Sequence, residues 1–417
     1  MGWIQIRGGN PLCGEVSIQG SKNAALPIMA ASVLVPGVTM LMNCPEISDV
    51  SCMCELLKCV GAKVSREGDR LVIDASRITG YRLPEEHVTR MRSSVILAGA
   101  MLGRCREVFF QYPGGCVIGD RPIDLHLAAL KKLGAVFTED GRHLTARARR
   151  LEGARIVLEF PSVGATENAV LAAVLAKGMT EIYRCAAEPE IKALCDFLNG
   201  AGARIRGGGT GHITVEGVQR LHESQWRVEA DRIVAGTYLI GVLAAGGKAR
   251  LLRAPARQLT AVLKLAERMG AKISADQEGI YVEGCGKIQS PGELETGVYP
   301  AIPTDLQSPL LVALCQADGK SSLTERIFNG RLAVAEELNR MGAGIEVEGN
   351  CARMEGGRSL TGSCVTAREL RGGAALVLAG LCARGYSRVY NRRFIDRGYE
   401  DIVRDLKSLG ADIGSET

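Results

Sequence analysis

The sequence predicts an α/β protein with two domains, each built from three copies of one βαβαββ unit. Three observations support this fold class. A Gly-Ala pair recurs six times at intervals of 68 to 73 residues, and an apolar segment of helical length lies upstream of each pair. The chain has 417 residues, which is too many for one ordinary hydrophobic core. Six units of about 70 residues divide evenly into two domains of three.

The Gly-Ala pairs are expected to end six amphipathic helices. Each pair follows a segment such as Leu-Leu-Lys-Cys-Val or Leu-Asn-Arg-Met, and a strand-like segment begins within two residues of it. Glycine after the last helical turn is a C-cap signal, because glycine adopts the required positive φ without steric cost. The six pairs are Gly61-Ala62, Gly134-Ala135, Gly202-Ala203, Gly270-Ala271, Gly342-Ala343 and Gly410-Ala411.

Six further helices are expected to be buried, because they are apolar on nearly every side. They cover residues 23–34, 91–102, 167–176, 233–245, 307–315 and 372–382. One opening strand is expected over residues 4–19, and the glycine-rich residues 207–211 are interpreted as a hairpin loop rather than a dinucleotide site. An open solenoid is the alternative architecture.

The division between the domains is placed near Glu229-Ala230, halfway through the repeats. The first domain is then residues 22–229. The second combines residues 1–21 with residues 230–417.

The composition indicates an ordered, soluble protein, with 46% hydrophobic and 23% charged residues. The net charge is only +5, and the Lys and Arg residues are scattered along the chain, so the sequence does not indicate a nucleic-acid-binding surface. A mild positive charge does suit a small anionic substrate. We expect no membrane partner, because no apolar stretch is long enough to cross a bilayer and the N-terminus does not resemble a signal peptide. These features predict a cytoplasmic protein.

The fourteen cysteines contain no Cys-x-x-Cys pair, and the five histidines never pair at i, i+4, so we expect no metal site. Most of the cysteines lie in apolar helical segments, where a free thiol behaves as a small hydrophobic group. Examples are Cys59, Cys195, Cys315 and Cys382.

Residues 112–126 are expected to form a loop, because three glycines and two prolines interrupt any regular helix or strand. The loop carries Cys116 and, five positions later, Arg121. One interpretation is a surface turn with an incidental cysteine. The other is a mobile active-site loop that presents an acid or nucleophile beside an anion clamp. The residues of the loop leave both open.

Polar and charged residues precede the six buried helices, and four of these six positions carry a cation. Any one of them is an ordinary helix cap. Because helix N-termini bind anions, the set together suggests two domains that direct helix N-termini toward a shared cleft holding a multiply charged anion. The segments are Ser21-Lys22-Asn23, Arg92-Ser93-Ser94, residues 162–166, Asp231-Arg232, Thr304-Asp305 and Arg371-Gly372-Gly373.

Five motifs resemble those of one enzyme family: residues 20–27, 113–126, 162–166, 303–307 and 396–399. From the first strand to the last helix, the chain resembles the UDP-N-acetylglucosamine 1-carboxyvinyltransferases, the enolpyruvyl transferases of the first committed step of peptidoglycan synthesis. The cysteine loop is specific, because the related shikimate-pathway enolpyruvyl transferases share the sixfold unit but lack it. The chain departs from the family at Asn329-Gly330, where Glu-Asn is expected, and at Gly372-Gly373, where a helix-favouring pair is expected.

The resemblance implies two inside-out α/β domains that close over the substrates. It implies transfer of the enolpyruvyl group of phosphoenolpyruvate to the 3'-hydroxyl of UDP-N-acetylglucosamine by addition and elimination, with release of phosphate. No metal or organic cofactor is implied, and a regulatory protein partner is left open. The family serves cell wall biogenesis, and through it cell shape and cell division.

The resemblance also assigns roles to residues. The catalytic set is Cys116, Asp305, Lys22 and Arg397, with Cys116 as the proton donor that can also bind phosphoenolpyruvate covalently and Asp305 as the base. Lys22, Arg121 and Arg397 hold the phosphate, and Arg331 and Arg371 hold the carboxylate. The sugar contacts Asn23 and Ile327. The uridine diphosphate is bound by Arg92, Arg121, Pro122, Ile123, Asp124, Leu125, Ser162, Val163 and Gly164.

Two other functions remain possible for these residues. One is an enolpyruvyl transferase with a different acceptor. The other is a catalytically weak paralogue that binds the sugar nucleotide and regulates partners, although the intact set of Lys22, Cys116, Asp305 and Arg397 argues against it.

Overall fold

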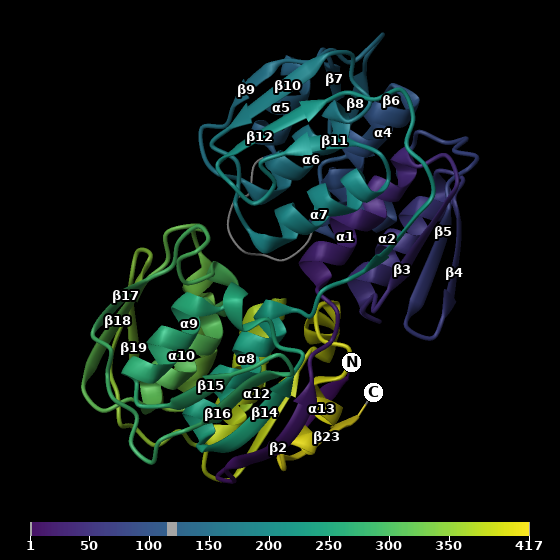
Figure 1. The fold of residues 1–417 in the computed structure, drawn as a ribbon. Coiled ribbons are helices and arrows are strands. Elements are labelled where there is room, and N and C mark those ends of the chain that lie inside the picture. The colour runs from purple at the N-terminus through teal and green to yellow at the C-terminus, as the bar shows by residue number, and fades with distance from the viewer. Residues whose placement is uncertain (1, 115–122, 417) are drawn as a thin grey trace. The chain divides into compact units, whose positions relative to one another are not determined.

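The computed structural model describes residues 2–114 and 123–416, which divide into two compact units (Figure 1). The first unit consists of residues 20–114 and 123–229, and the second of residues 2–19 and 230–416. The first unit begins at Gly20. Gly20 packs so closely on the Asn43 carbonyl that a Cβ would lie 1.9 Å from its oxygen, and Ser21 caps the helix that follows.

The first unit contains three sheets, with strand orders β13-β3-β5-β4, β6-β8-β7 and β11-β12-β10-β9. Neighbouring strands are antiparallel, except that β13 pairs with β3 and β9 with β10 in parallel. The strands are β3 (Val38–Met42), β4 (Lys63–Glu67), β5 (Arg70–Asp74), β6 (Glu107–Gln111), β7 (Val136–Asp140), β8 (His143–Arg147), β9 (Arg155–Val157), β10 (Met179–Tyr183), β11 (Arg204–Arg206), β12 (His212–Glu216) and β13 (Ser224–Arg227).

The helices of the first unit are α1 (Lys22–Ala31), α2 (Ser48–Cys59), α3 (Glu85–Val88), α4 (Leu97–Cys105), α5 (Asp124–Lys132), α6 (Val163–Ala173) and α7 (Pro189–Gly200). Two short 3₁₀ helices join them, η1 (Ser32–Leu34) and η2 (Arg92–Ile96). The helix expected at 91–102 is therefore η2 followed by α4.

The second unit also contains three sheets, with strand orders β15-β16-β14-β2, β17-β18-β20-β19 and β21-β22-β1-β23. Each has one parallel pair at an edge, β2 with β14, β17 with β18 and β21 with β22. The strands are β1 (Trp3–Arg7), β2 (Leu12–Ser17), β14 (Gly247–Leu252), β15 (Lys272–Ala275), β16 (Gly279–Glu283), β17 (Glu293–Glu295), β18 (Lys320–Thr324), β19 (Ile345–Glu348), β20 (Cys351–Glu355), β21 (Cys364–Thr366), β22 (Tyr386–Tyr390) and β23 (Asp412–Glu416).

The helices of the second unit are α8 (Arg232–Ala245), α9 (Thr260–Arg268), α10 (Gln307–Gln316), α11 (Val334–Arg340), α12 (Leu370–Cys382) and α13 (Ile402–Ser408). Four 3₁₀ helices accompany them, η3 (Ala256–Gln258), η4 (Thr304–Leu306), η5 (Arg331–Ala333) and η6 (Arg392–Arg397).

The predicted repeat is confirmed by the six Gly-Ala pairs. All six glycines have φ between 82° and 106°, beyond the ends of α2, α5, α7, α9, α11 and α13. In each pair the alanine N–H donates to a carbonyl five residues earlier, at 2.9 to 3.2 Å. This is the hydrogen bond of a Schellman cap, formed six times.

The helices predicted to be buried form the centre of each unit. Helices α1, α4 and α6 lie in one hydrophobic core, and α8, α10 and α12 lie in the other. Within each unit the sheets lie outside these helices (Figure 1), so the helices are enclosed by sheets. Residues 207–211 join the antiparallel strands β11 and β12, as predicted.

The opening segment differs from the single strand expected over 4–19. It forms two strands, β1 and β2, which belong to different sheets of the second unit. Gly8, between them, packs so closely on Gly380 and Ala383 that a Cβ would lie 2.2 to 2.3 Å from their carbonyl oxygens. The strands that precede α1 and α8 are exchanged: β2 pairs with β14, and β13 pairs with β3.

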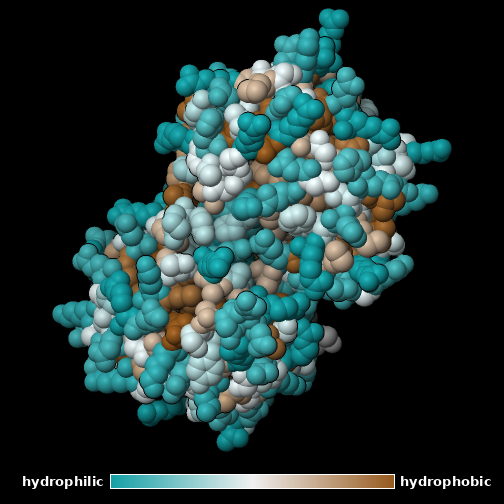
Figure 2. Space-filling model, viewed as in Figure 1, coloured by the Kyte–Doolittle hydropathy of each residue, from teal (hydrophilic) through white to brown (hydrophobic). Residues whose placement is uncertain are grey.

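The cysteines of the described residues are all free. Cys195 and Cys315 are buried and Cys382 is partly buried. Cys59 lies in helix α2 as expected, but it is exposed at the last turn of that helix and so does not behave as a buried hydrophobic group. No helix among the described residues is long and apolar enough to span a membrane. Figure 2 shows a mainly hydrophilic face with small hydrophobic areas.

Candidate active site

The predicted site residues fall into two groups, one in each unit. Lys22, Asn23, Arg92, residues 123–125 and residues 162–164 lie in the first unit, and Asp305, Ile327, Arg331, Arg371 and Arg397 lie in the second. Cys116, Arg121 and Pro122 lie outside the described residues.

In the second unit, the structure brings Asp305 together with two predicted arginines. Arg331 Nη2 donates to Asp305 Oδ1 at 2.7 Å, and Arg371 Nη2 donates to Oδ2 at 3.1 Å. The two arginine side chains are only 2% and 3% exposed, whereas that of Asp305 is 26% exposed. Both oxygens of one carboxylate therefore accept charge-assisted hydrogen bonds from buried cations.

The surrounding contacts hold this cluster in place. Arg331 Nη1 donates to Thr304 Oγ1 at 3.0 Å, and Thr304 Oγ1 donates to Glu325 Oε2 at 2.9 Å. The other oxygen of Glu325 accepts the backbone N–H groups of Ile327 and Phe328, at 2.7 and 3.1 Å. Buried Glu325, which the sequence did not indicate, thus connects the arginine cluster to Ile327.

Arg371 lies over the ring of Tyr399, with its Cζ 5.8 Å from the ring centre. The Tyr399 hydroxyl is 2.8 Å from Thr237 Oγ1, and burial raises the pKa of Tyr399. Burial acts to lower the pKa of Arg371, but Asp305, Tyr399 and Asp231 together raise it above the ordinary arginine value, so Arg371 remains charged.

Two arginine nitrogens in this cluster have unsatisfied hydrogen-bonding capacity. Among the described residues, no group accepts a hydrogen bond from Arg331 Nε or Arg371 Nη1, although both atoms are buried. Buried donors without acceptors are costly in free energy, and an anionic ligand would satisfy them.

Both departures from the family motif have local explanations. Gly330 has φ +74° immediately before η5, a conformation that glycine adopts freely. Gly373 lies against η6, where a Cβ would be 2.7 Å from Ile395 Cγ1. Glu369 caps α12 by accepting the N–H groups of Arg371 and Gly372. Arg397 ends η6, two residues before Tyr399.

In the first unit, Lys22 is the first residue of α1, and Asn23 follows it. Ser21 caps the helix by accepting the N–H of Ala24 at 3.3 Å. Lys22 Nζ lies 2.7 Å from Asp49 Oδ2, and the two side chains are 9% and 4% exposed. Asp49, in the first turn of α2, was not identified from the sequence.

The other predicted residues of the first unit lie at the starts of η2, α5 and α6. Arg92 begins η2, Asp124 begins α5, and Ser162 caps α6 by accepting the Ala165 N–H at 3.3 Å. Ile123 is buried, and Leu125 is partly buried. At the start of α6, Val163 and Gly164 have no hydrogen-bond acceptor for their N–H groups within the described part of the chain.

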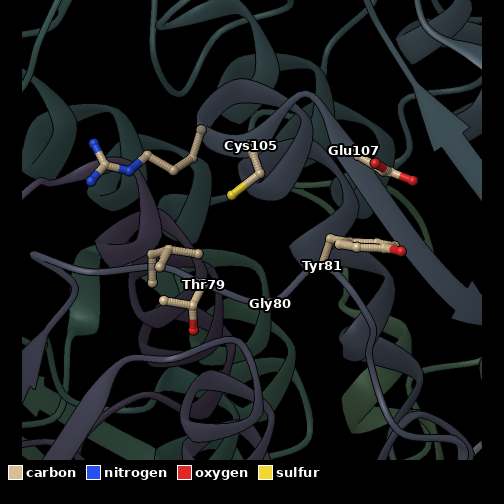
Figure 3. Close-up of a pocket in the computed structure, with 7 residues that line it drawn as sticks. Thr79, Gly80, Tyr81, Cys105 and Glu107 are labelled. Atoms are coloured by element: carbon tan, nitrogen blue, oxygen red, sulfur yellow. The ribbon is translucent and has the colours of Figure 1, made fainter.

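The residues that the structure describes contain no group of three or more His, Cys, Asp or Glu side chains that could hold a metal ion. A separate cavity of about 330 Å³ in the first unit is lined by Ile78, Thr79, Gly80, Tyr81, Arg104, Cys105 and Glu107. The Cys105 sulfur points toward Thr79 and Gly80 (Figure 3), and none of the predicted site residues lines this cavity.

Comparison with known proteins gives consistent results. Residues 6–406 match the family of EPSP synthase (3-phosphoshikimate 1-carboxyvinyltransferase). The chain is 44% identical to UDP-N-acetylglucosamine 1-carboxyvinyltransferase 2 of Caldanaerobacter subterraneus subsp. tengcongensis, over 99% of both chains. It is 42% identical to UDP-N-acetylglucosamine 1-carboxyvinyltransferase of Cellvibrio japonicus, over 98% of both.

Solved structures support the fold. The enolpyruvyl transferase NikO from Streptomyces tendae aligns with a TM-score of 0.88 and 24% identity, covering 100% of this chain and 99% of NikO. EPSP synthase from Acinetobacter baumannii aligns with a TM-score of 0.76 and 17% identity over the whole of both chains. The chain therefore belongs to the EPSP synthase family of enolpyruvyl transferases, and within it to the UDP-N-acetylglucosamine 1-carboxyvinyltransferases.

Proposed function

We propose that this transferase moves the enolpyruvyl group of phosphoenolpyruvate to the 3'-hydroxyl of UDP-N-acetylglucosamine and releases phosphate, the first committed step of peptidoglycan synthesis. The observation that carries the proposal is the Asp305 carboxylate between buried Arg331 and Arg371, each with a nitrogen that has no described acceptor. This arrangement suits the reaction for two reasons. The Asp305 carboxylate can take the proton of the attacking hydroxyl, and the two arginines can bind an anionic group of phosphoenolpyruvate.

In the addition step, Asp305 takes the proton of the sugar hydroxyl while the hydroxyl oxygen bonds to C2 of phosphoenolpyruvate. Cys116 delivers a proton to C3, which gives a tetrahedral adduct that still carries the phosphate. In the elimination step, the Cys116 thiolate takes a proton back from C3, the C2–C3 double bond forms again, and the C2–O bond breaks with its electron pair leaving on phosphate. Cys116 also forms a covalent adduct with phosphoenolpyruvate through its sulfur.

The cations divide between the two charged groups of phosphoenolpyruvate. Arg331 and Arg371 hold the carboxylate, and their burial supports this role because water competes little there. Lys22, Arg121 and Arg397 hold the phosphate. Asp49, through its ion pair, fixes the Lys22 side chain at the start of α1.

The nucleotide sugar binds through residues that the family motifs supply. Arg92 and Arg121, with residues 122–125 and 162–164, hold the uridine diphosphate, and Asn23 and Ile327 contact the sugar. The N–H groups of Val163 and Gly164 support this assignment, because phosphates bind at helix N-termini. No cofactor is needed for these steps.

We propose a cytoplasmic location, since every cysteine of the described residues is free, as expected in a reducing compartment. We also propose that residues 22–229 form one domain and that residues 1–21 with residues 230–417 form the other.

The decisive experiment measures phosphate release from phosphoenolpyruvate with and without UDP-N-acetylglucosamine. We expect release only when both substrates are present, together with a product that contains the enolpyruvyl group. Release that does not depend on the nucleotide sugar would refute the acceptor. No release with either this or another hydroxyl acceptor would refute the reaction.

A further inference from the structure

His126 lies on α5 beside the start of α6, and the family motifs give it no role in the function proposed above. Its side chain is almost completely buried. Its Nδ1 is 2.7 Å from Asn168 Nδ2, on the neighbouring helix α6. Among the described residues, no hydrogen bond to the other ring nitrogen, Nε2, accompanies this contact.

The contacts of Asn168 determine which nitrogen of His126 carries the proton. Asn168 Oδ1 accepts the Gly99 N–H at 2.6 Å, and Asn168 Nδ2 donates to the Val95 carbonyl at 3.0 Å. These two backbone groups can play only those roles, so they fix the orientation of the amide. The second hydrogen of Nδ2 then points to His126 Nδ1, which must accept it. The proton of the neutral imidazole is therefore on Nε2.

The surroundings keep His126 neutral. Burial, followed by the charge of Arg92, lowers its pKa to about 4, and Asp124 opposes this only in part. At neutral pH the side chain is thus an uncharged ring with one N–H donor, at Nε2.

That donor lies against the N-terminus of α6. A Cβ on Gly164 would be 2.7 Å from His126 Cε1 and 3.1 Å from Nε2, so this edge of the ring contacts the second residue of the helix. Here the N–H groups of Val163 and Gly164 also have no acceptor among the described residues. Three N–H donors therefore lie together at the N-terminus of α6, and the charge of Arg92 acts on His126 at the same place.

We propose that His126 is a phosphate-binding residue, whose Nε2–H, oriented by Asn168, donates to the diphosphate of the nucleotide sugar at the N-terminus of α6. The inference rests on the proposed function for the identity of the ligand. It also gives Asn168 a task, which is to hold the imidazole in the donating tautomer.

The first test measures binding of UDP by calorimetry, without turnover. A charged acceptor makes this a strong hydrogen bond, so His126→Phe should weaken UDP binding about tenfold to a hundredfold. His126→Gln should restore most of the affinity, because the glutamine amide places an N–H near the position of Nε2. His143→Phe, on strand β8, is the matched control and should bind UDP like the unchanged protein.

Turnover separates this role from a general effect on the fold. His126→Phe should raise the KM for UDP-N-acetylglucosamine and leave the KM for phosphoenolpyruvate unchanged. An equal loss for both substrates, unchanged UDP binding by His126→Phe, or a His126→Gln variant as weak as His126→Phe would overturn the proposal.

A measurement on the unchanged protein covers the case in which His126→Phe does not fold. With ¹⁵N-labelled histidine, the His126 signals should show a proton on Nε2, which shifts on addition of UDP but not of uridine. A proton on Nδ1, or no response to UDP, would overturn the proposal. If the protein binds UDP in this way but releases no phosphate from phosphoenolpyruvate, the proposed reaction fails and the role of His126 stands.

Discussion

Replacing Asp305 by asparagine should destabilise the second unit as well as stop the reaction. The carboxylate accepts hydrogen bonds from Arg331 and Arg371, whose side chains are 2% and 3% exposed. Removing one partner of a buried ion pair typically costs about 3–5 kcal/mol, because the remaining charge is left uncompensated. Since Asp305 itself is 26% exposed, we take the lower end, about 3 kcal/mol.

For a unit of this size, a loss of about 3 kcal/mol lowers Tm by roughly 6–12 °C. Differential scanning calorimetry of Asp305→Asn measures this shift, and the phosphate-release assay on the same sample measures turnover. The matched control is Asp276→Asn, whose carboxylate pairs with Arg250 at an exposed position and should leave Tm unchanged. A Tm for Asp305→Asn within 2 °C of the unchanged protein would refute the view that the carboxylate offsets two buried charges.

Three further predictions follow from the sequence and structure. Cys116→Ser should lose most turnover in the phosphate-release assay, and an epoxide of the fosfomycin type should add to Cys116, as judged by mass spectrometry; unchanged turnover would make the thiol a bystander. Gly270→Ala should lower the free energy of unfolding in urea by about 1–2 kcal/mol, because φ is +106° there, whereas Gly211→Ala, in open space, should have little effect. The pKa of His126 is about 4 in the folded protein and 6.5 for an ordinary histidine, so the unfolded chain binds the proton more readily. The stability that the neutral His126 contributes is therefore present above pH 6.5 and is lost as the pH falls toward 4. Relative to His126→Gln, the unchanged protein should therefore lose about 3 kcal/mol over that range in urea unfolding, and parallel pH profiles would contradict this.

Local sequence signals were sufficient to predict the repeat. Each glycine of the six caps needs a positive φ, which few other residues adopt, so its position in the sequence marks the end of a helix. The apolar helices were predicted for a similar reason, since continuous apolar sequence of that length must be buried. For example, the helix expected at 233–245 is α8, Arg232–Ala245.

Pairings between distant segments could not be predicted in this way. The exchange of β2 and β13 depends on which parallel neighbour each strand finds, β14 for β2 and β3 for β13. The His126–Asn168 contact joins residues 42 positions apart, and the Asp305–Arg371 contact joins residues 66 positions apart. No periodicity in the sequence indicates such contacts.

Three of the cations that the sequence analysis placed before buried helices share one unfavourable feature. Lys22 and Arg232 are the first residues of α1 and α8, and Arg371 is the second residue of α12. A cation at a helix N-terminus faces the positive end of the helix dipole, at a cost of about 0.3–1 kcal/mol, and burial adds to that cost. Carboxylates offset this cost, with Asp49 beside Lys22 and Asp305 beside Arg371. A sequence that places cations where the backbone already repels them is consistent with selection for binding an anion rather than for stability.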